Sequence, residues 1–406
     1  MEGAEGAGGA QSTGGAGGAD GADRGRGAAG GDGADRADRE GRAVGGGGAA
    51  GGRGGAGAGR GDGLRAYIGS FTSGGGHGVT TAAVDPATGA LTVLSALGEV
   101  EDPSYLAVAR DTGLLYAVSE TDRGAVAVFR PTAEGLAPVG RAVAVGGSGP
   151  THLSVAGRRL LTANYTSGGV SSLPLAADGS PAGPASVLEH RGSGPDAGRQ
   201  ERPHAHQVLP DPTGRWVLSV DLGTDSVRVC GPDRDTGGLR VHAETALRAG
   251  TGPRHLAFHP DGAVVYVLHE LEPQLTVCRW DAASGRLEPV AEVPVVSEAG
   301  AGGVRAYPSA VVASPDGRFV WAAVRGADVI VTLSLAGGAE EPRRTDTVAC
   351  GGSWPRDLAV DPSGRRLYAA NERSGEVTWF DVDPLSGRPG RAGSVAVPAA
   401  TCVVFA

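Results

Sequence analysis

Residues 254–280 read RHLAFHPDGAVVYVLHELEPQLTVCRW and contain three short apolar runs separated by turn signals. The runs RHLAF (254–258), VVYVLHE (264–270) and LTVCRW (275–280) have the length of β-strands and are too short for helices. The turn HPDG at 259–262 supplies the Pro, Asp and Gly that a tight hairpin needs. The stretch therefore predicts three consecutive antiparallel strands.

The same pattern recurs along the chain with a repeat length of about 50 residues, which is within the range of blade repeats. The first runs of its six copies are SYLAV (from Ser104), THLSV (from Thr151), HAHQVL (from His204), RHLAF (from Arg254), SAVVA (from Ser309) and RDLAV (from Arg356). No long helical periodicity interrupts these copies, so we predict an all-β fold built from repeated blades.

The two ends of the repeat region complement each other. The N-terminal runs RAYIGSF (65–71), GVTTAAV (78–84) and ALTVLSAL (90–97) read as second, third and fourth strands without a first. The C-terminal TCVVFA (401–406) reads as a first strand alone. Pairing the two ends completes a seventh blade and closes the ring, which removes exposed sheet edges. A β-sandwich, the rival fold, explains neither the regular repeat nor the complementary ends.

Composition sets the domain limits and excludes several classes of partner. Residues 1–63 contain 27 Gly and almost no large apolar residue, so we predict a disordered tail there and one propeller domain over 64–406. The net charge of −9 argues against nucleic-acid binding. The four cysteines form no C-x-x-C pair, and no stretch is apolar enough to span a membrane. We expect a cytoplasmic monomer.

Up-and-down blades bring the start of the first strand and the end of the second to one rim of the central channel. The first-strand starts on this rim are Ser104, His152, His204, His206, Arg254, His255, Tyr307, Ser309, Arg356 and Asp357. The second-strand ends are Ser70, Phe71, Glu120, Asn164, Tyr165, Asp221, Glu270, Arg325, Asn371 and Glu372. The opposite rim carries mostly turn residues, so we predict the functional site on the rim that is rich in His, Arg and carboxylates.

Several motifs also resemble a known family. They are PHAH (203–206), DLGTDSV (221–227), GTGPRH (250–255), HEL (269–271), SPDGRFVWAAVRGADVI (314–330), WPRDLAVDPSG (354–364), ANERS (370–374), YIGSFTSG (67–74) and TCVVF (401–405). Over residues 64–406 the chain is similar to the lactonase-type seven-bladed propellers, which include bacterial 6-phosphogluconolactonases and fungal carboxymuconate cyclases. The resemblance implies a catalytic cluster of His, Arg, Glu and Arg. It departs from the family at His269, where Asn is common, and at Ala323 and Val324.

Carried onto this chain, the implied cluster consists of His204 or His206, Arg254, Glu270 and Arg325. Lactone hydrolysis needs a positioned water, a base and donors for the oxyanion. Glu270 is our first candidate for the base, with His206 or His204 as the rival, and Glu270 as a salt-bridge partner of Arg254 is an equal alternative. Arg254 and Arg325 are candidates to bind a substrate anion or to polarise the lactone carbonyl. The candidate substrate-binding residues are Arg356, His255, His152, Asp221 and Asn164.

We predict hydrolysis of a sugar lactone, above all 6-phosphogluconolactone, at the top of the channel and without a cofactor. His204, His206 and Glu270 would also suit a divalent metal ion, but no further ligand with matching spacing stands out, so no metal is predicted. Two other functions stay open at this point. One is a lactonising cycloisomerase that acts on a carboxymuconate, and the other is a propeller that binds partners without catalysis.

Overall fold

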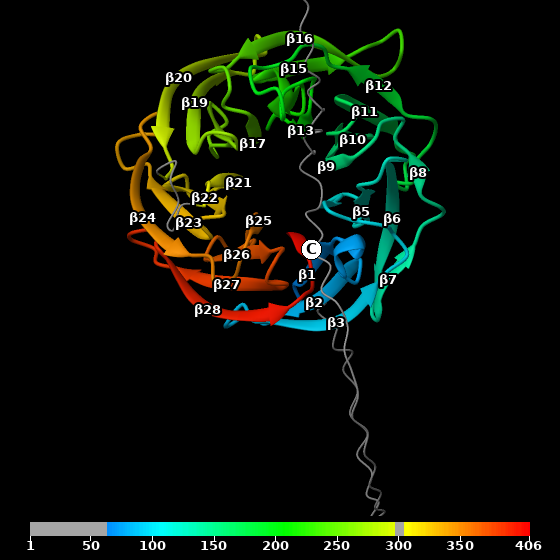
Figure 1. Ribbon diagram of the computed structural model, residues 1–406. Coiled ribbons are helices and arrows are strands. Elements are labelled where there is room, and N and C mark those ends of the chain that lie inside the picture. The colour runs from blue at the N-terminus through cyan, green and yellow to red at the C-terminus, as the bar shows by residue number, and fades with distance from the viewer. Residues whose placement is uncertain (1–62, 297–303) are drawn as a thin grey trace, which may run out of the picture.

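The computed structural model describes residues 63–296 and 304–406, and these form a ring of seven β-sheets around a central channel (Figure 1). The predicted disordered tail falls on residues that, Gly63 apart, lie outside the described residues. The fold is all-β, as predicted, and its only helical pieces in the described part are the 3-10 turns η1 (Thr72–Gly74) and η2 (Leu222–Thr224).

Each sheet runs from an inner strand at the channel to an outer strand at the edge of the disc. From inner to outer, the first three sheets are β29 (Ala400–Phe405), β1 (Arg65–Ser70), β2 (Val79–Val84), β3 (Leu91–Leu97); β4 (Leu106–Val108), β5 (Leu115–Ser119), β6 (Ala125–Thr132), β7 (Gly135–Pro138), with β8 (Val143–Ala144) also on β6; and β9 (Pro150–Ala156), β10 (Arg159–Asn164), β11 (Gly169–Pro174), β12 (Ser186–Glu189).

The other four sheets follow the same plan. From inner to outer they are β13 (Ala205–Pro210), β14 (Val217–Asp221), β15 (Ser226–Pro232), β16 (Leu239–Ala246); β17 (Pro253–Phe258), β18 (Val264–His269), β19 (Gln274–Asp281), β20 (Arg286–Pro294); β21 (Tyr307–Ala313), β22 (Phe319–Arg325), β23 (Val329–Ser334), β24 (Arg343–Ala349); and β25 (Pro355–Val360), β26 (Arg366–Asn371), β27 (Glu376–Val382), β28 (Pro389–Ala396).

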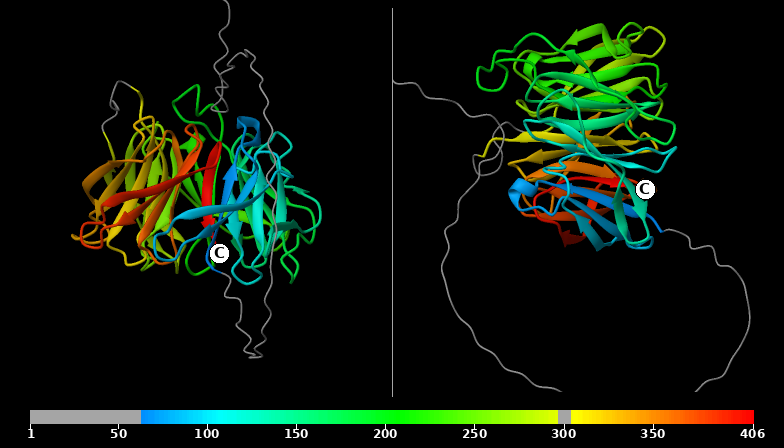
Figure 2. Two further views of the ribbon diagram at one scale, coloured as in Figure 1. Left: turned by 90° about the horizontal axis from the view of Figure 1, so that it is seen from below. Right: turned by 90° about the vertical axis from the view of Figure 1, so that its right-hand side faces the viewer.

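The first and last strands of the repeat region close the ring. β1 pairs antiparallel with β29, with Ala66 opposite Phe405 and Ile68 opposite Val403. In Figure 2 the last strand, in red, lies beside the first strands, in blue. The predicted closure by both ends of the chain is confirmed, and it pairs the last strand, β29, with a second strand, as in the other six blades.

Neighbouring blades are joined by apolar packing and by a repeated hydrogen bond. Each sheet buries apolar residues against the next sheet around the ring, as Val267 of β18 packs beside Val220 of β14. An aromatic residue in the second strand, or directly before it in the case of Trp216, also donates to a turn carbonyl of the following blade. The pairs are Tyr116 to Gly179, Trp216 to Ala282, Tyr266 to Ala339, Trp321 to Gly387 and Tyr368 to Gly89, at 2.7–2.8 Å. The ring is therefore a rigid scaffold for its rim.

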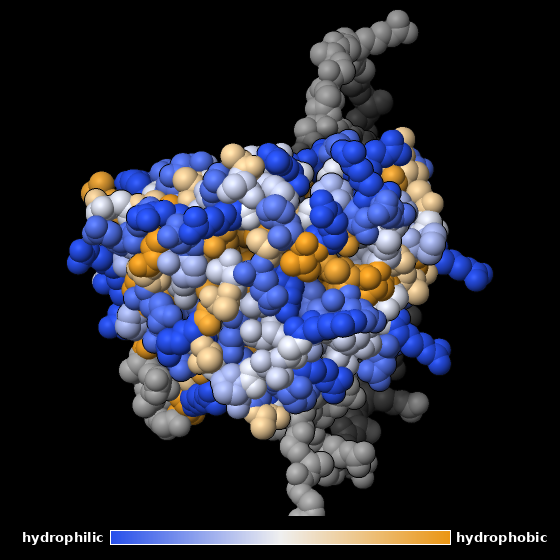
Figure 3. Space-filling model, turned by 90° about the horizontal axis from the view of Figure 1, so that it is seen from above, coloured by the Kyte–Doolittle hydropathy of each residue, from blue (hydrophilic) through white to orange (hydrophobic). Residues whose placement is uncertain are grey.

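The outer edge of the disc is largely polar. Side chains of β16 and β24 alternate between exposed and half-buried positions, as expected for strands with one face in water. In Figure 3 this edge is mostly hydrophilic, and hydrophobic residues form small groups between polar ones. Val187 on β12 and Val241 on β16 are among the few large apolar side chains that are exposed there.

Candidate active site

Strand pairing places the predicted rim residues together. Each inner strand begins opposite the end of the second strand of its blade, as Pro253 lies opposite His269 and Pro355 opposite Asn371. The start of the inner strand and the end of the second strand therefore lie at the same rim, as predicted. Side chains from all seven inner strands therefore converge on one mouth of the channel.

A β-bulge at the start of the inner strand recurs around the ring. Within the part of the chain that the structure describes, six sheets shift register there. The extra residue is Thr151, His206, Arg254, Arg356 or Thr401 in five of them. A bulge leaves one residue unpaired and turns its side chain away from the regular alternation. In these blades the bulge thus directs the side chain of its extra residue toward the channel.

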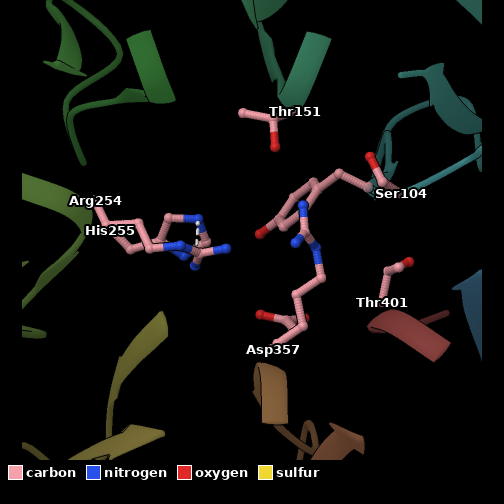
Figure 4. A pocket seen from close by; sticks show the side chains of 8 residues that line it. Ser104, Thr151, Arg254, His255, Asp357 and Thr401 are labelled. Carbon is pink, nitrogen blue, oxygen red and sulfur yellow. Dashed lines mark hydrogen bonds between the residues drawn. The ribbon is translucent and has the colours of Figure 1, made fainter. Parts of the chain in front are cut away.

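A cavity opens at the centre of this ring of bulges. The space between its atoms, counted out into the open solvent at its mouth, is about 210 Å³, and the cavity is lined by Ser104, Tyr105, Thr151, Arg254, His255, Arg356, Asp357 and Thr401. Figure 4 shows the labelled side chains reaching in from different inner strands. Four of the eight lining residues occupy bulge positions, so the bulges lie around the cavity.

Glu270 forms the centre of a buried charge cluster beside the cavity. Its Oε2 lies 3.0 Å from Nε of Arg254 and 2.7 Å from Nη2 of Arg325. Its Oε1 accepts from Nη2 of Arg199 at 2.6 Å. The side chains of Glu270, Arg254 and Arg325 are only 2–3% exposed, and that of Arg199 is 17% exposed. Three guanidinium groups therefore surround one carboxylate.

These contacts decide the protonation states of the cluster. Burial alone would raise the pKa of Glu270, but the positive charges of Arg325, Arg199 and Arg254 outweigh it and hold the pKa well below its usual range. Burial and the charge of Arg325 lower the pKa of Arg254 to about 9, so its guanidinium stays charged at neutral pH. A carboxylate held by three cations is a weak base. Our first candidate for the base, Glu270, is therefore better suited to holding the arginines in place.

A group of neutral imidazoles lies next to the arginines. The ring of His255 is 5.3 Å from that of His206 and 5.7 Å from that of His152, centroid to centroid. Burial, together with the charge of Arg254, lowers the pKa of all three, to about 3 for His152. Nδ1 of His206 and Nδ1 of His152 are buried and have no hydrogen-bond partner among the described residues. Neutral imidazoles with unused nitrogens beside a cavity are available for proton transfer or for hydrogen bonds to a ligand.

His204, the other candidate, directly precedes β13 and is hydrogen-bonded to the protein itself. Its Nδ1 lies 2.9 Å from the carbonyl oxygen of Tyr165 and its Nε2 lies 3.3 Å from Oε2 of Glu201. Its ring also stacks on the Tyr165 ring at 4.5 Å. Both nitrogens have partners, so His204 supports the rim, and of the two histidines only His206 remains a candidate base.

Asn164 and Asp221, two predicted substrate-binding residues, point into their blades. Asn164 Nδ2 donates to Oγ of Ser171 at 2.7 Å, and Asp221 accepts from Arg228 at 3.0 Å, each pair seven residues apart. Asp221 also lies 2.7 Å from Nδ1 of His190. Both side chains are 0% exposed and lie outside the cavity lining. The residue after Asn164 is Tyr165, whose ring instead contacts the rim histidines His204 and His206.

Arg356 stands on the other side of the cavity among carboxylates. Its guanidinium lies 3.6 Å from Glu120 and 3.5 Å from Glu372, and it sits over the ring of Phe71. Burial raises the pKa of Glu120 and of Asp357, the second carboxyl that lines this side. Two charged clusters therefore adjoin the cavity through residues that line it. The basic wall consists of Glu270 with Arg254, Arg325 and Arg199, and the acidic wall consists of Arg356 with Glu120, Glu372 and Asp357.

One member of the basic wall was missed by the sequence analysis. Arg199 lies on the connection from β12 to β13, outside the blade repeat, so repeat positions did not point to it. The signal that could have found it is the unusual length of this connection, residues 190–204. Among the described residues no group of His, Cys, Asp or Glu has the geometry of a metal site, and no helix there is long and apolar enough to cross a membrane.

Comparison with known proteins identifies the family. The model of the family "Lactonase, 7-bladed beta-propeller" matches residues 65–405. This chain belongs to that lactonase family. It is 32% identical to the 6-phosphogluconolactonase of Bacillus subtilis over 344 residues, which cover 84% of this chain and 97% of the relative. It is also 32% identical to the 6-phosphogluconolactonase of Pectobacterium carotovorum, with 59% and 68% covered. The solved periplasmic gluconolactonase of Pseudomonas aeruginosa superposes with a TM-score of 0.77, at 30% identity and with 84% and 98% covered.

This lactonase-family propeller has an unusual backbone conformation at Trp354, directly before the inner strand β25. The residue before the inner strand is left-handed in several blades, with φ of 58° at Gly149, 59° at Gly252 and 64° at Trp354. Glycine adopts this conformation without strain, whereas a bulky side chain does not. The Trp354 ring packs against the guanidinium groups of Arg325 and Arg373, whose Cζ atoms lie 5.3 and 3.5 Å from the ring centroid. We infer that Trp354 positions Arg325.

We predict that Trp354→Gly is more stable than Trp354→Ala. Both variants lose the aromatic ring, but only the Ala variant keeps a Cβ in the left-handed region, so the difference in unfolding free energy is expected to be about 1 kcal/mol. Urea denaturation of the two variants measures it. Because both lack the contact with Arg325, their kcat/KM values should fall together. Equal stability of the two variants would contradict the strain at this position.

His269 is hydrogen-bonded inside its own blade and allows a test of pH dependence. Its Nε2 lies 2.7 Å from Oγ1 of Thr276, seven residues on. Asn164 and Asn371 occupy the same place in other blades and donate to Ser171 and Thr378. The His269→Asn variant therefore keeps the blade's own hydrogen-bond pattern and removes one buried imidazole.

We expect the protein to lose stability as the pH falls below about 6.5. Burial lowers the pKa of four histidines, His152, His206, His255 and His269, and the values are about 3 for His152 and His269. Between about pH 6.5 and 3 the unfolded chain binds protons that the folded chain does not, so the free energy of unfolding decreases with falling pH. The raised pKa values of Glu120 and Asp357 stabilise the folded protein as the pH falls. The four histidines outnumber these two carboxyl groups, so we expect a net loss of stability. Urea denaturation as a function of pH measures the slope, which should be shallower in His269→Asn.

Proposed function

We propose that this protein hydrolyses a sugar lactone and that 6-phosphogluconolactone is its substrate. The observation that carries the proposal is the pairing of a buried cationic cluster with neutral imidazoles at one cavity. Arg254 lines that cavity, and His206 contacts His255, which also lines it. The names of relatives in Bacillus subtilis and Pectobacterium carotovorum support the choice of the phosphorylated lactone.

In the proposed reaction His206 is the general base. Burial and the charges of Arg254, Arg356 and Arg325 lower its pKa, so its imidazole is neutral at physiological pH. Both oxygens of Glu270 are held in ion pairs, whereas Nδ1 of His206 has no partner among the described residues and can accept a proton. It removes a proton from water as the water oxygen forms a bond to the lactone carbonyl carbon. The ester bond to the ring oxygen then breaks, and that oxygen receives the proton from the imidazolium. Water is consumed, the ring opens, and His206 returns to its neutral form.

Arg254 stabilises the negative charge that develops on the carbonyl oxygen. Glu270 at 3.0 Å and the carbonyl oxygen of Ser309 hold its guanidinium from two sides, so its orientation is fixed before the substrate binds. Arg325 shares the same carboxylate oxygen and reinforces the positive potential. Donors that are already oriented at a water-poor site need no reorganisation as charge develops.

The test is a direct assay of purified protein with 6-phosphoglucono-1,5-lactone, followed by proton release in weak buffer. Lactones hydrolyse spontaneously, so the comparison is with the same solution without protein. We expect a clear excess rate that saturates with substrate. A rate equal to the spontaneous one would reject the proposal, and turnover of a carboxymuconate, followed by its ultraviolet absorbance, would instead identify a cycloisomerase.

A further inference from the structure

The connection from β12 to β13, residues 190–204, contributes Arg199 to the basic wall. It leaves the outer edge of one blade and reaches the inner strand of the next. The segment is held by its own contacts, because the backbone N–H of Gln200 donates to the Asp196 carbonyl at 2.7 Å and its Nε2 donates to the Leu222 carbonyl at 2.9 Å. Gln200 is 0% exposed. Arg199 therefore projects from an anchored segment.

Arg199 spans three consecutive blades at the mouth of the channel. Its Nη2 donates to Glu270 Oε1 at 2.6 Å and to the hydroxyl of Tyr165 at 3.2 Å. Tyr165 follows β10, Glu270 follows β18, and Arg199 itself comes from the segment that leads into β13. With 17% of its side chain exposed, against 3% for Arg254 and for Arg325, it is the guanidinium of this cluster that an incoming solute meets first.

The charges of the cluster do not balance. Arg199, Arg254 and Arg325 contribute three positive charges against the single negative charge of Glu270. Glu201, the nearest acidic residue on the segment, pairs with Arg202 and His204 instead. Arg356, by contrast, already faces Glu120 and Glu372. In the basic wall three guanidinium groups form ion pairs with one carboxylate, and a positive potential of this kind favours an anionic ligand.

We propose that Arg199 determines specificity for lactones that carry an anionic group, by binding that group at the rim. The inference rests on the proposed function and adds the residue that recognises the anionic group of the substrate. A phosphate replaces Glu270 as the partner of Arg199, and Glu270 keeps Arg254 and Arg325. Guanidinium groups bind phosphate oxygens through pairs of charge-assisted hydrogen bonds, which suits Arg199 to this exchange.

The test compares two substrates, 6-phosphoglucono-1,5-lactone and the neutral glucono-1,5-lactone. The specificity ratio is kcat/KM for the first divided by kcat/KM for the second. In Arg199→Gln we expect this ratio to fall about 10- to 100-fold, as for the loss of a hydrogen bond to a charged group. The change should lie mainly in KM for the phosphorylated lactone, and Arg199→Lys, which keeps the charge, should recover part of the ratio.

Arg202→Gln is the matched control. Arg202 lies on the same segment, is 58% exposed and pairs with Glu201, so its replacement should leave the ratio unchanged. An unchanged ratio in Arg199→Gln, or an equal loss with both lactones, would overturn the role of Arg199. Failure of the proposed function is a different result, since the wild-type protein would then hydrolyse neither lactone above the spontaneous rate.

Discussion

Replacing His206 by Ala is expected to lower kcat/KM for lactone hydrolysis by about 100- to 10,000-fold, because the water then lacks a positioned general base. The pKa of His206 is well below 6.5, so the wild-type rate should stay high as the pH falls from 7 through 6.5 and decline only at more acidic pH. In the variant this acid limb should disappear. The rate is measured by proton release at saturating and at low substrate concentration.

Two further measurements make the result specific to His206. Added imidazole should restore part of the activity of His206→Ala, because the substitution leaves room for a free base next to His255. His242→Ala is the control, since His242 is exposed on the outer strand β16 and should not affect the rate. A full wild-type rate in His206→Ala would remove His206 from the mechanism and return the role of base to Glu270.

Replacing Arg254 by Gln is expected to lower kcat by about 100- to 1,000-fold, the usual effect of removing one preorganised oxyanion donor. The fold should survive, because Glu270 keeps Arg199 and Arg325 as partners and is not left as an uncompensated buried charge.

Glu270→Gln, by contrast, is expected to destabilise the fold. It leaves three guanidinium groups without their counter-ion, which is expected to cost about 3–5 kcal/mol in the free energy of unfolding.

The control for Arg254→Gln is Arg279→Gln in the same blade. Arg279 pairs with Glu340 at 2.7 Å, but its side chain is 57% exposed, and exposed pairs contribute about 1 kcal/mol or less. Its loss should change neither kcat nor the melting temperature appreciably. If Arg254→Gln kept the wild-type kcat while its KM rose, Arg254 would bind the substrate in its ground state only.

The pattern of strands and turns determined the ring. Apolar runs of five to seven residues, turn residues after each first run and complementary ends were enough to predict seven blades and their closure. The rim could also be predicted, because the start of the first strand and the end of the second must meet in any up-and-down blade. Arg254, His255 and Arg356 were predicted to lie on the rim for this reason, and they line the cavity.

The sequence did not resolve which of two neighbouring residues faces the channel. Asn164 and Tyr165 both stand at the end of β10, yet Asn164 bonds to Ser171 inside its blade while Tyr165 contacts the rim histidines. A shift of one residue reverses the side on which a strand residue lies, and a bulge causes such a shift without a sequence signal of its own. The inward direction of His206 and Arg254 was therefore decided by backbone register.

By itself, the order of residues determined the local strands, their repetition and the end of the blades at which charged groups gather, because these depend on short-range periodicity and turn chemistry. Only the tertiary structure decided what those groups do. It brought Arg199 from a long connection to Glu270, so that three cations suppress the basicity of that carboxylate, and it buried His206 in their positive field. The acidity and charge of a group depend on neighbours that the chain supplies from distant positions, and strand periodicity carries no information about them.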